Sequence, residues 1–268
     1  MAAALGMELT RTYGISVVDY NNDGLDDVYI AMRLGRNKLF KNLGNGAFEE
    51  VSRQAFVDYY GEYIQACWAD IDNDGFLDFY LGTGNYRPNL LFRNNGRGGF
   101  EEIGQAAGVQ INDRTSANML ADVNNDGLVD LYLAIPHKPN YLFLNNGDLT
   151  FTDVTEASGA IDELIAMGSG FFDYDNDGDQ DLYLSHDTDQ ANILYRNDGN
   201  GVFTDVSAVA GVDYVGQAMG VDFADFDHDG WQDIYITNLF ENVLFRNNQD
   251  GTFSNVSEVQ KVDDYGMA

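Results

Sequence analysis

The chain has 268 residues, of which 44 are acidic and 14 are basic, and its formal net charge at pH 7 is -30. This charge argues against binding to nucleic acid or insertion into anionic membranes, because both surfaces are negative as well. A single cysteine excludes an internal disulfide, and no apolar run approaches the roughly 18 residues that a membrane span requires.

The first predicted elements are a short apolar strand at residues 14–18, a nine-residue loop at 19–27 and a second strand at 28–30. Asp or Asn stands at positions 1, 3, 5 and 9 of the loop, and Gly24 stands at position 6. Loops with this spacing wrap oxygen ligands around Ca²⁺, and glycine permits the sharp turn. The sequence therefore predicts a β-hairpin whose turn binds calcium.

The same loop occurs four more times, and the first aspartates of successive loops are 51 or 52 residues apart. A unit of this length cannot bury a core alone, so the repeats are expected to stack on one another. The further copies occupy residues 70–78, 122–130, 173–181 and 225–233.

Each repeat continues with a second signature, which in the second repeat is Asn-Leu-Leu-Phe-Arg-Asn at residues 89–94. A turn rich in Asn and Gly then leads to a run that begins with Phe100. Asn and Gly tolerate positive φ, so this pattern predicts a second hairpin made of the third and fourth strands. No segment is predicted to be a helix, and the chain is expected to be all-β.

Repeated four-stranded sheets pack well in a β-propeller, where blades stack face to face and leave only short exposed edges. We predict a single domain at residues 1–268, a five-bladed β-propeller with four antiparallel strands per blade and a calcium loop between the first two strands. An open fragment of a larger ring is the alternative. The blades are expected at about residues 14–56, 65–108, 117–159, 168–211 and 220–262.

The loop Asp-x-Asp-x-Asp-Gly-x-x-Asp, the aromatic strand behind it and the run Asn-x-Leu-Phe-Arg-Asn-x-Gly-x-Gly-x-Phe together resemble the FG-GAP/VCBS repeat family. The resemblance covers residues 14–262 and is nearest to the repeats of cartilage acidic protein-like and ASPIC/UnbV-type proteins. It implies a calcium-bearing propeller of the kind found in integrin α-subunits, in lectins and in accessory domains of secreted proteins. These proteins differ in function, so the fold does not settle what this chain does.

We expect about five Ca²⁺ ions, one per blade, because each loop offers four side-chain oxygens and the backbone carbonyl of position 7. Asn21 and Asn124 replace Asp at position 3, which keeps an oxygen but loses a charge, so these two sites are expected to bind more weakly. The crowded carboxylates repel one another without metal, which makes the ions structural. The predicted ligands are Asp19, Asn21, Asp23, Leu25, Asp27, Asp70, Asp72, Asp74, Phe76, Asp78, Asp122, Asn124, Asp126, Leu128, Asp130, Asp173, Asp175, Asp177, Asp179, Asp181, Asp225, Asp227, Asp229, Trp231 and Asp233.

The loops between the second and third strands and the linkers between repeats vary most from repeat to repeat. Loops on a rigid scaffold usually carry binding residues, although such residues can equally be ordinary solvated ones. The candidate ligand-binding residues are Arg33, Arg36, Tyr60, Arg87, His137 and His186.

The predicted function is a calcium-binding extracellular recognition or adhesion module, monomeric and lectin-like, that binds a glycan or an extracellular protein. Dependence on millimolar calcium indicates an extracellular or periplasmic location, although the first 14 residues lack the features of a signal peptide. A purely structural or designed repeat scaffold is the first alternative, and a polysaccharide-active enzyme is the second. We expect no enzymatic activity, because nucleophile, zinc and phosphate-binding motifs are absent from the sequence.

Overall fold

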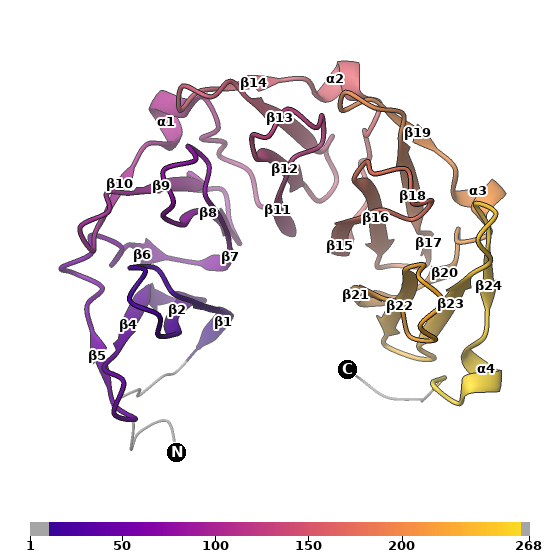
Figure 1. Ribbon diagram of the computed structural model, residues 1–268, viewed down its shortest axis with the longest axis horizontal. Helices are drawn as coiled ribbons and strands as arrows, with labels where there is room; N and C mark the ends of the chain where they lie inside the picture. Colours follow the sequence, from indigo (N-terminus) through magenta and orange to yellow (C-terminus); the bar gives the residue numbers. More distant parts are fainter. Residues whose placement is uncertain (1–10, 264–268) are drawn as a thin grey trace. The chain divides into compact units, whose positions relative to one another are not determined.

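The computed structural model describes residues 11–263, and this part of the chain forms five four-stranded sheets and two two-stranded sheets (Figure 1). In each four-stranded sheet the strands lie in sequence order. Their pairing is antiparallel in the first, second, fourth and fifth sheets, for example where β1 pairs with β2 and β8 with β9. The predicted repeat of four antiparallel strands is therefore confirmed.

The strands of the five sheets have closely similar lengths from repeat to repeat. The first sheet contains β1 (Thr12–Val18), β2 (Asp27–Met32), β4 (Lys38–Asn42) and β5 (Phe48–Glu50). The second contains β7 (Tyr63–Ala69), β8 (Asp78–Thr83), β9 (Leu90–Asn94) and β10 (Phe100–Glu102). The third contains β11 (Ala117–Ala121), β12 (Asp130–Ala134), β13 (Tyr141–Asn145) and β14 (Phe151–Asp153). The fourth contains β15 (Ala166–Phe172), β16 (Asp181–His186), β18 (Ile193–Asn197) and β19 (Phe203–Asp205), and the fifth β21 (Ala218–Ala224), β22 (Asp233–Asn238), β23 (Val243–Asn247) and β24 (Phe253–Asn255).

The chain divides into two compact units, and the division falls within the third repeat. The first unit runs to Leu120 and also includes Leu128–Leu131 and Phe143–Thr152. The second comprises Ala121–Gly127, Tyr132–Leu142 and the chain from Asp153 onward. The prediction of a single closed ring of five blades stays a prediction.

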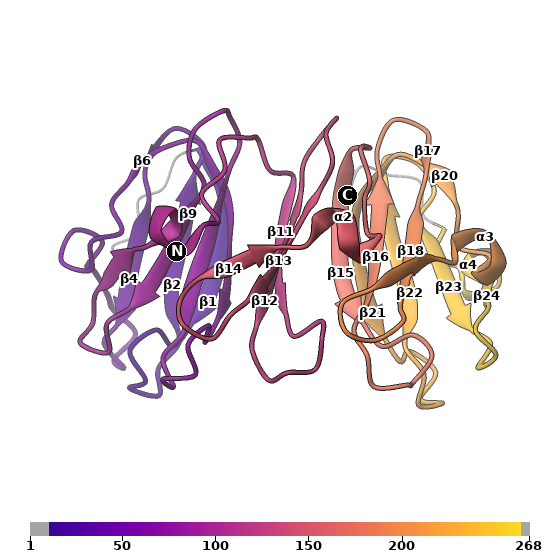
Figure 2. The same ribbon diagram turned by 90° about the horizontal axis from the view of Figure 1, so that it is seen from above.

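The predicted calcium loops are the turns between the first two strands of a sheet. Val18 pairs with Asp27 where β1 meets β2, and Ala69 pairs with Asp78 where β7 meets β8. Because the strands alternate in direction, this turn and the turn between the third and fourth strands lie at one end of each sheet. The loop between the second and third strands lies at the other end, and Figure 2 shows loops at both ends of the strands.

Two small sheets organise the loops at that second end. β3 (Gly35–Arg36) pairs with β6 (Tyr60–Gly61), and β17 (Gln190–Ala191) pairs with β20 (Val215–Gly216). In each case a loop after the second strand is tied to the linker that leads to the next sheet.

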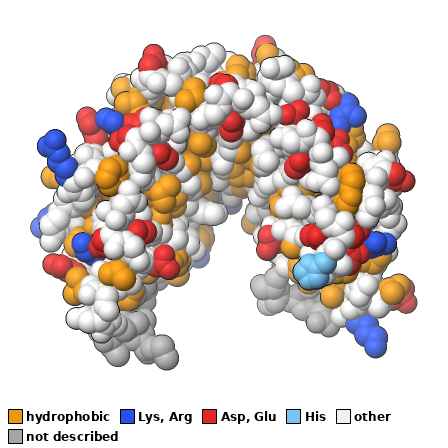
Figure 3. All heavy atoms as spheres, viewed as in Figure 1, with side chains coloured by type: hydrophobic (Ala, Val, Ile, Leu, Met, Phe, Trp, Pro, Cys, Tyr) orange, Lys and Arg blue, Asp and Glu red, His pale blue; other side chains and the backbone are white. Residues whose placement is uncertain are grey.

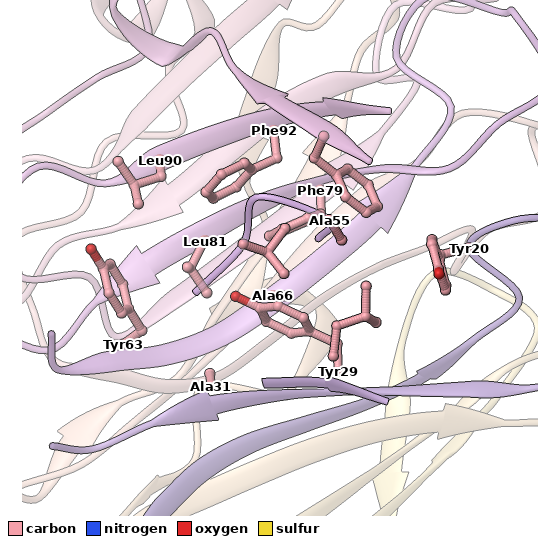
Figure 4. Packing of buried hydrophobic residues seen from close by; sticks show 13 residues of the cluster. Tyr20, Tyr29, Ala31, Ala55, Tyr63, Ala66, Phe79, Leu81, Leu90 and Phe92 are labelled. Carbon is pink, nitrogen blue, oxygen red and sulfur yellow. The ribbon is translucent and has the colours of Figure 1, made fainter. Parts of the chain in front are cut away.

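The core of the first unit lies between the first two sheets, where buried aromatic rings of β2, β7, β8 and β9 meet (Figure 4). Tyr29 contacts Phe79 at a ring-centroid distance of 4.9 Å and the edge of Trp68 at 5.7 Å. Aromatic pairs of this kind add to the stability that apolar burial provides. The aromatic position of the second strand thus supplies the packing between consecutive repeats.

Four single-turn helices correct the prediction that the chain contains no helix. They are α1 (Gly104–Ala107), α2 (Thr155–Ser158), α3 (Ser207–Ala210) and α4 (Ser257–Gln260), each placed directly after the fourth strand of a sheet. Four residues are too few to show helical periodicity in a sequence. The available signal is the left-handed residue that follows each helix, which is glycine after α1, α2 and α3. Between residues 11 and 263, no helix is long and apolar enough to cross a membrane.

Candidate metal centre

The first residue of each loop closes the turn by accepting two backbone hydrogen bonds. The Asp70 carboxylate accepts the N–H of Asp74 at 3.0 Å and the N–H of Gly75 at 2.8 Å. Gly75 adopts a φ of 90°, which is the reason for glycine at this position. The equivalent bonds at Asp19, Asp122, Asp173 and Asp225 have the same pattern.

The last aspartate of each loop is buried and ties the loop to the third strand. Asp78 accepts the N–H of Ile71 at 3.0 Å and the N–H of Asn94 at 2.6 Å. Desolvation raises the pKa of Asp78, and likewise that of Asp181, to about 7, although the backbone hydrogen bonds act in the opposite direction. A buried carboxylate that resists ionisation in the absence of metal is suited to a divalent cation, which would restore its charge. The other members of this set, Asp27, Asp130, Asp181 and Asp233, are buried as well.

Three of the five loops gather carboxylates closely enough to hold one metal ion. In each group the candidate ligand oxygens all lie within 4.8 Å of one another. The groups are Asp70, Asp72 and Asp78 in the second loop, Asp173, Asp175 and Asp181 in the fourth, and Asp225, Asp227 and Asp229 in the fifth.

Position 3 provides the observation that tests whether these groups fit a cation. The Oδ1 atoms of Asp72 and Asp175 are buried and have no hydrogen-bond partner in the described part of the chain. An unpaired buried carboxylate oxygen is costly, so such atoms call for a partner. An all-oxygen set of carboxylates is the donor type that Ca²⁺ and other hard cations prefer, and the residues therefore fit such an ion.

In the two loops with Asn at position 3, this Asn side chain itself contacts a carboxylate of the loop. The Asn21 amide lies 3.4 Å from the Asp27 carboxylate, and the Asn124 amide donates to Asp126 at 3.0 Å. In the first loop, the Lys41 ammonium also lies 3.1 Å from Asp23. The hydrogen bond from Lys41 to Asp23 is the main reason that the pKa of Asp23 is lowered. Internal donors thus take up part of the negative charge in these two loops. Arginines do the same in two Asp-type loops, where Arg93 lies 2.6 Å from Asp72 and Arg246 lies 2.6 Å from Asp227.

Sequence reasoning missed the asparagine at the end of the third strand as a part of the loop. Asn94 donates through Nδ2 to the Tyr20 carbonyl of the preceding repeat at 2.8 Å. Asn145 reaches Ile71, Asn197 reaches Val123 and Asn247 reaches Tyr174 in the same way, each at 2.8 Å. The recurrence of Asn at this place in the printed sequence is the signal that could have revealed it.

Position 4 of the loop, which the sequence pattern left open, also links consecutive repeats. It adopts a left-handed conformation in all five loops, with φ from 55° to 60°, and is Asn in four of them. Asn22 donates to the Gly75 carbonyl at 2.7 Å, and Asn176 donates to the Gly230 carbonyl at 3.2 Å. Asn tolerates this conformation better than most residues. Hydrogen bonds therefore connect the first loop to the second and the fourth loop to the fifth.

The backbone carbonyls predicted as ligands at position 7 belong to Leu25, Phe76, Leu128, Asp179 and Trp231. The spacing of side-chain oxygens does not test them, and they stay predictions.

The structure brings together three of the predicted ligand-binding residues. Arg36 and Tyr60 are paired across the β3–β6 sheet, and the Arg87 guanidinium lies 3.5 Å from the Tyr60 carbonyl. Tyr60 is 54% exposed and neighbouring Tyr86 is 79% exposed. We refer to Arg36, Tyr60, Tyr86 and Arg87 as the Arg-Tyr surface.

Arg33 lies in the same unit but in a separate setting. Its guanidinium carbon sits 5.3 Å from the centre of the Tyr13 ring, and the residue lines a cavity of about 430 Å³ with Arg11, Leu34 and Glu62.

The two histidines on the candidate set belong to the other unit. His137 is exposed. His186 is 0% exposed, and its ring nitrogens lie 2.9 Å from Asp162 and 2.7 Å from the Ala191 carbonyl. His186 was predicted to be a ligand-binding residue of a variable loop, and this placement is corrected, because His186 is the buried last residue of β16 and its ring is turned inward between these two acceptors.

The comparisons with known proteins agree with the repeat pattern. Four overlapping segments, residues 19–81, 70–133, 122–184 and 173–236, match the model of the FG-GAP-like repeat. Cartilage acidic protein 1 of Mus musculus is 28% identical over 258 residues, and the match covers 84% of this chain. The chain spans only 40% of the length of that relative.

Two solved structures show the same fold. One is a lectin of Agrocybe aegerita that recognises non-reducing terminal N-acetylglucosamine, with a TM-score of 0.59 and 17% identity over 98% of this chain and 69% of that chain. The other is the V. cholerae biofilm matrix protein Bap1, with a TM-score of 0.53 and 16% identity over 91% of this chain and 38% of that chain. An all-β chain of small antiparallel sheets with these repeats is consistent with a β-propeller.

Proposed function

Because the chain belongs to the FG-GAP-like repeat family, we propose that it is a calcium-stabilised β-propeller that serves as an extracellular recognition or adhesion module. Calcium would occupy all five loops, one ion per blade, and hold the blades in place. The module would act as a monomer, and its partner would be a glycan or an extracellular protein. The proposal assigns no catalytic reaction, since the metal loops account for the clustered carboxylates.

The buried, unpaired oxygens of Asp72 and Asp175 are the observation that carries the calcium part. A bound ion would neutralise the carboxylates, and the protein residues would keep the loop in the conformation that binds the ion. Asp70 and its equivalents would close the loop, while Asp78 and its equivalents would fix the loop to the third strand. Extracellular calcium is millimolar, which suits sites of moderate affinity.

The recognition part is supported by the Arg-Tyr surface. Arg36 and Arg87 lie at the exposed Tyr60, and the exposed Tyr86 directly precedes Arg87, in a chain with only 14 basic residues. Figure 3 shows that carboxylates are spread over the visible face while basic side chains are few. Tyrosine and arginine favour contact with partners, because both offer large planar surfaces with polar edges. The names of the relatives, a cartilage protein, a lectin and a biofilm matrix protein, agree with recognition outside the cell.

A glycan array in 1 mM calcium, repeated with extracellular matrix proteins, would test the proposal. We expect a selective signal that Arg87→Ala reduces by about tenfold, as loss of a well-placed arginine at an interface can do. Arg97→Ala is the matched control, since Arg97 is an exposed arginine at the opposite end of the same sheet. Equal losses in both variants, or no selective binding at all, would favour a purely structural repeat scaffold.

A further inference from the structure

The second unit contains three equivalent cavities that no role described above uses. Each lies between the start of the third strand, the end of the fourth strand and the single-turn helix that follows, beside α2, α3 and α4. Their volumes are about 560, 430 and 440 Å³. We call them the helix pockets.

An apolar side chain is exposed at the same helix position in each pocket. Val209 in α3 is 80% exposed and Val259 in α4 is 79% exposed, while the exposed Ala157 takes this place in α2. A single exposed valine needs no explanation. Two valines that are about 80% exposed occupy the same helix position in consecutive repeats, each beside a cavity. This recurrence indicates a surface that contacts a partner.

Each pocket has an exposed carboxylate among its polar side chains. Glu156 lies in the first, Asp213 in the second and Glu258 in the third, and all three residues are exposed. No Lys, Arg or His lines any of the three pockets within the described residues. These three carboxylates take part in no salt bridge recorded between residues 11 and 263.

A second acidic or amide side chain in each pocket is already held in place. Asp153 accepts the hydroxyl of Thr155 at 2.6 Å, and Asn255 accepts that of Ser257 at 2.6 Å, while Asp205 accepts that of Ser207. Because these bonds fix the start of each helix, the pocket walls are preformed rather than assembled on binding.

We propose that the helix pockets bind the lysine or arginine side chains of a basic, extended segment of a partner protein. The aliphatic stem of such a side chain would cover the exposed valine or alanine, and its charged head would meet the carboxylate. A chain of net charge -30 would also attract a basic partner over a distance. Three equivalent pockets would bind one segment several times, which raises affinity without new types of contact.

This proposal goes beyond the recognition role proposed above, because it concerns a different surface and a partner of the opposite charge. The Arg-Tyr surface lies in the first unit, whereas all three helix pockets lie in the second. A failure of one proposal therefore leaves the other untouched.

The test uses fluorescence anisotropy with a labelled octalysine peptide, at physiological ionic strength and with calcium in excess so that the metal loops are neutralised. The pocket variant is Glu156→Gln, Asp213→Asn and Glu258→Gln combined. The control variant is Glu49→Gln, Asp222→Asn and Glu101→Gln, which are also exposed and change the charge by the same amount. Melting temperatures of both variants check that each is folded.

We expect the pocket variant to raise the Kd of octalysine by about tenfold, as the loss of three exposed charge pairs allows, and the control to raise it less than about twofold. A peptide of eight diaminopropionate residues, which has the same charge but short stems, should bind the wild type more weakly than octalysine. Equal weakening in both variants would show that only the overall charge attracts the peptide, and would overturn the proposal. A glycan signal that the pocket variant alone abolishes would overturn it in favour of a sugar.

Discussion

The first and fourth loops have the same spacing of oxygens, but they differ in whether other side chains compensate the negative charge of their carboxylates. In the first loop, Asn21 takes the place of an aspartate and Lys41 lies 3.1 Å from Asp23. In the fourth loop, Asp175 keeps a buried oxygen without a partner, and the nearby Arg196 bonds to Asp198 in the following turn instead. The first loop is thus partly neutralised from within, whereas no salt bridge is recorded for the carboxylates at positions 1, 3, 5 and 9 of the fourth loop within the described residues.

We infer from this difference that the residue at position 3, together with the nearest basic side chain, influences how strongly a loop binds a cation. Burial raises the pKa of Asp175, and the neighbouring Asp177 and Asp173 raise it further. The same fourth loop holds Asp181, whose pKa is about 7. We therefore expect the Asp-type loops to bind calcium more tightly than the Asn-type loops and to suffer more when it is removed.

Of the changes considered, removal of calcium should lower the melting temperature the most. If each site binds with a Kd near 10 μM, then 1 mM calcium would stabilise the folded state by about 2.7 kcal/mol per site. Five such sites approach the whole net stability of a typical domain, which is about 5 to 15 kcal/mol. Thermal unfolding in 1 mM calcium and after treatment with a chelating resin should differ by about 20 °C or more. A difference of less than about 3 °C would show that the loops are stable as plain turns.

The metal-free protein should lose stability as the pH rises. Burial holds the pKa of Asp78 and Asp181 near 7, while an unfolded aspartate titrates near 4. The folded state therefore keeps protons that the unfolded state releases between about pH 4 and pH 7, so the free energy of unfolding falls across this window. The melting temperature should be about 10 °C higher at pH 5 than at pH 8. Saturating calcium serves as the control, since bound metal keeps both carboxylates ionised and should remove this trend; greater metal-free stability at pH 8 would contradict it.

Exchanging Asp and Asn at position 3 should change metal-free stability and calcium affinity in opposite directions in the two loops. Asp175→Asn is expected to raise the metal-free melting temperature, because it removes a desolvated charge, and to weaken calcium at that site by about tenfold. Asn21→Asp should do the reverse in the first loop. Thermal melts at graded calcium concentrations measure both effects. Shifts of the same sign in the two variants would show that position 3 does not set the difference.

Lys41→Met should have the smallest effect. It removes the internal counter-ion of the first loop, so calcium should bind there up to about fivefold more tightly, in line with the small energy of an exposed ion pair. Lys261→Met removes an exposed lysine outside the loops and is the matched control. An equal change in both would reduce the effect to the overall charge of the chain.

Much of this structure could be predicted because it follows from a repeated local pattern. The spacing of Asp and Gly in residues 70–78 determines a hairpin turn, and the short apolar run Phe79-Tyr80-Leu81 behind it is typical of a strand buried on both faces, as β8 is. The single-turn helices were missed because four residues show no period. The inward turn of His186 was missed because it depends on Asp162, which is 24 residues away in the sequence.

The hydrogen bonds between repeats also could not be predicted from the sequence of a single loop. The bond from Asn94 to Tyr20 joins residues 74 positions apart. Only the three-dimensional stacking of sheets brings such atoms together, although the repeated Asn could have indicated an essential contact. The helix pockets likewise arise where three separate segments converge.

Isothermal titration of the metal-free protein with calcium tests the central claim most directly. We predict about five ions per chain in two classes, with the loops that begin at Asp70, Asp173 and Asp225 binding before those that begin at Asp19 and Asp122. Absence of binding at millimolar calcium, or a single class of sites that the Asp175→Asn variant leaves unchanged, would contradict the account.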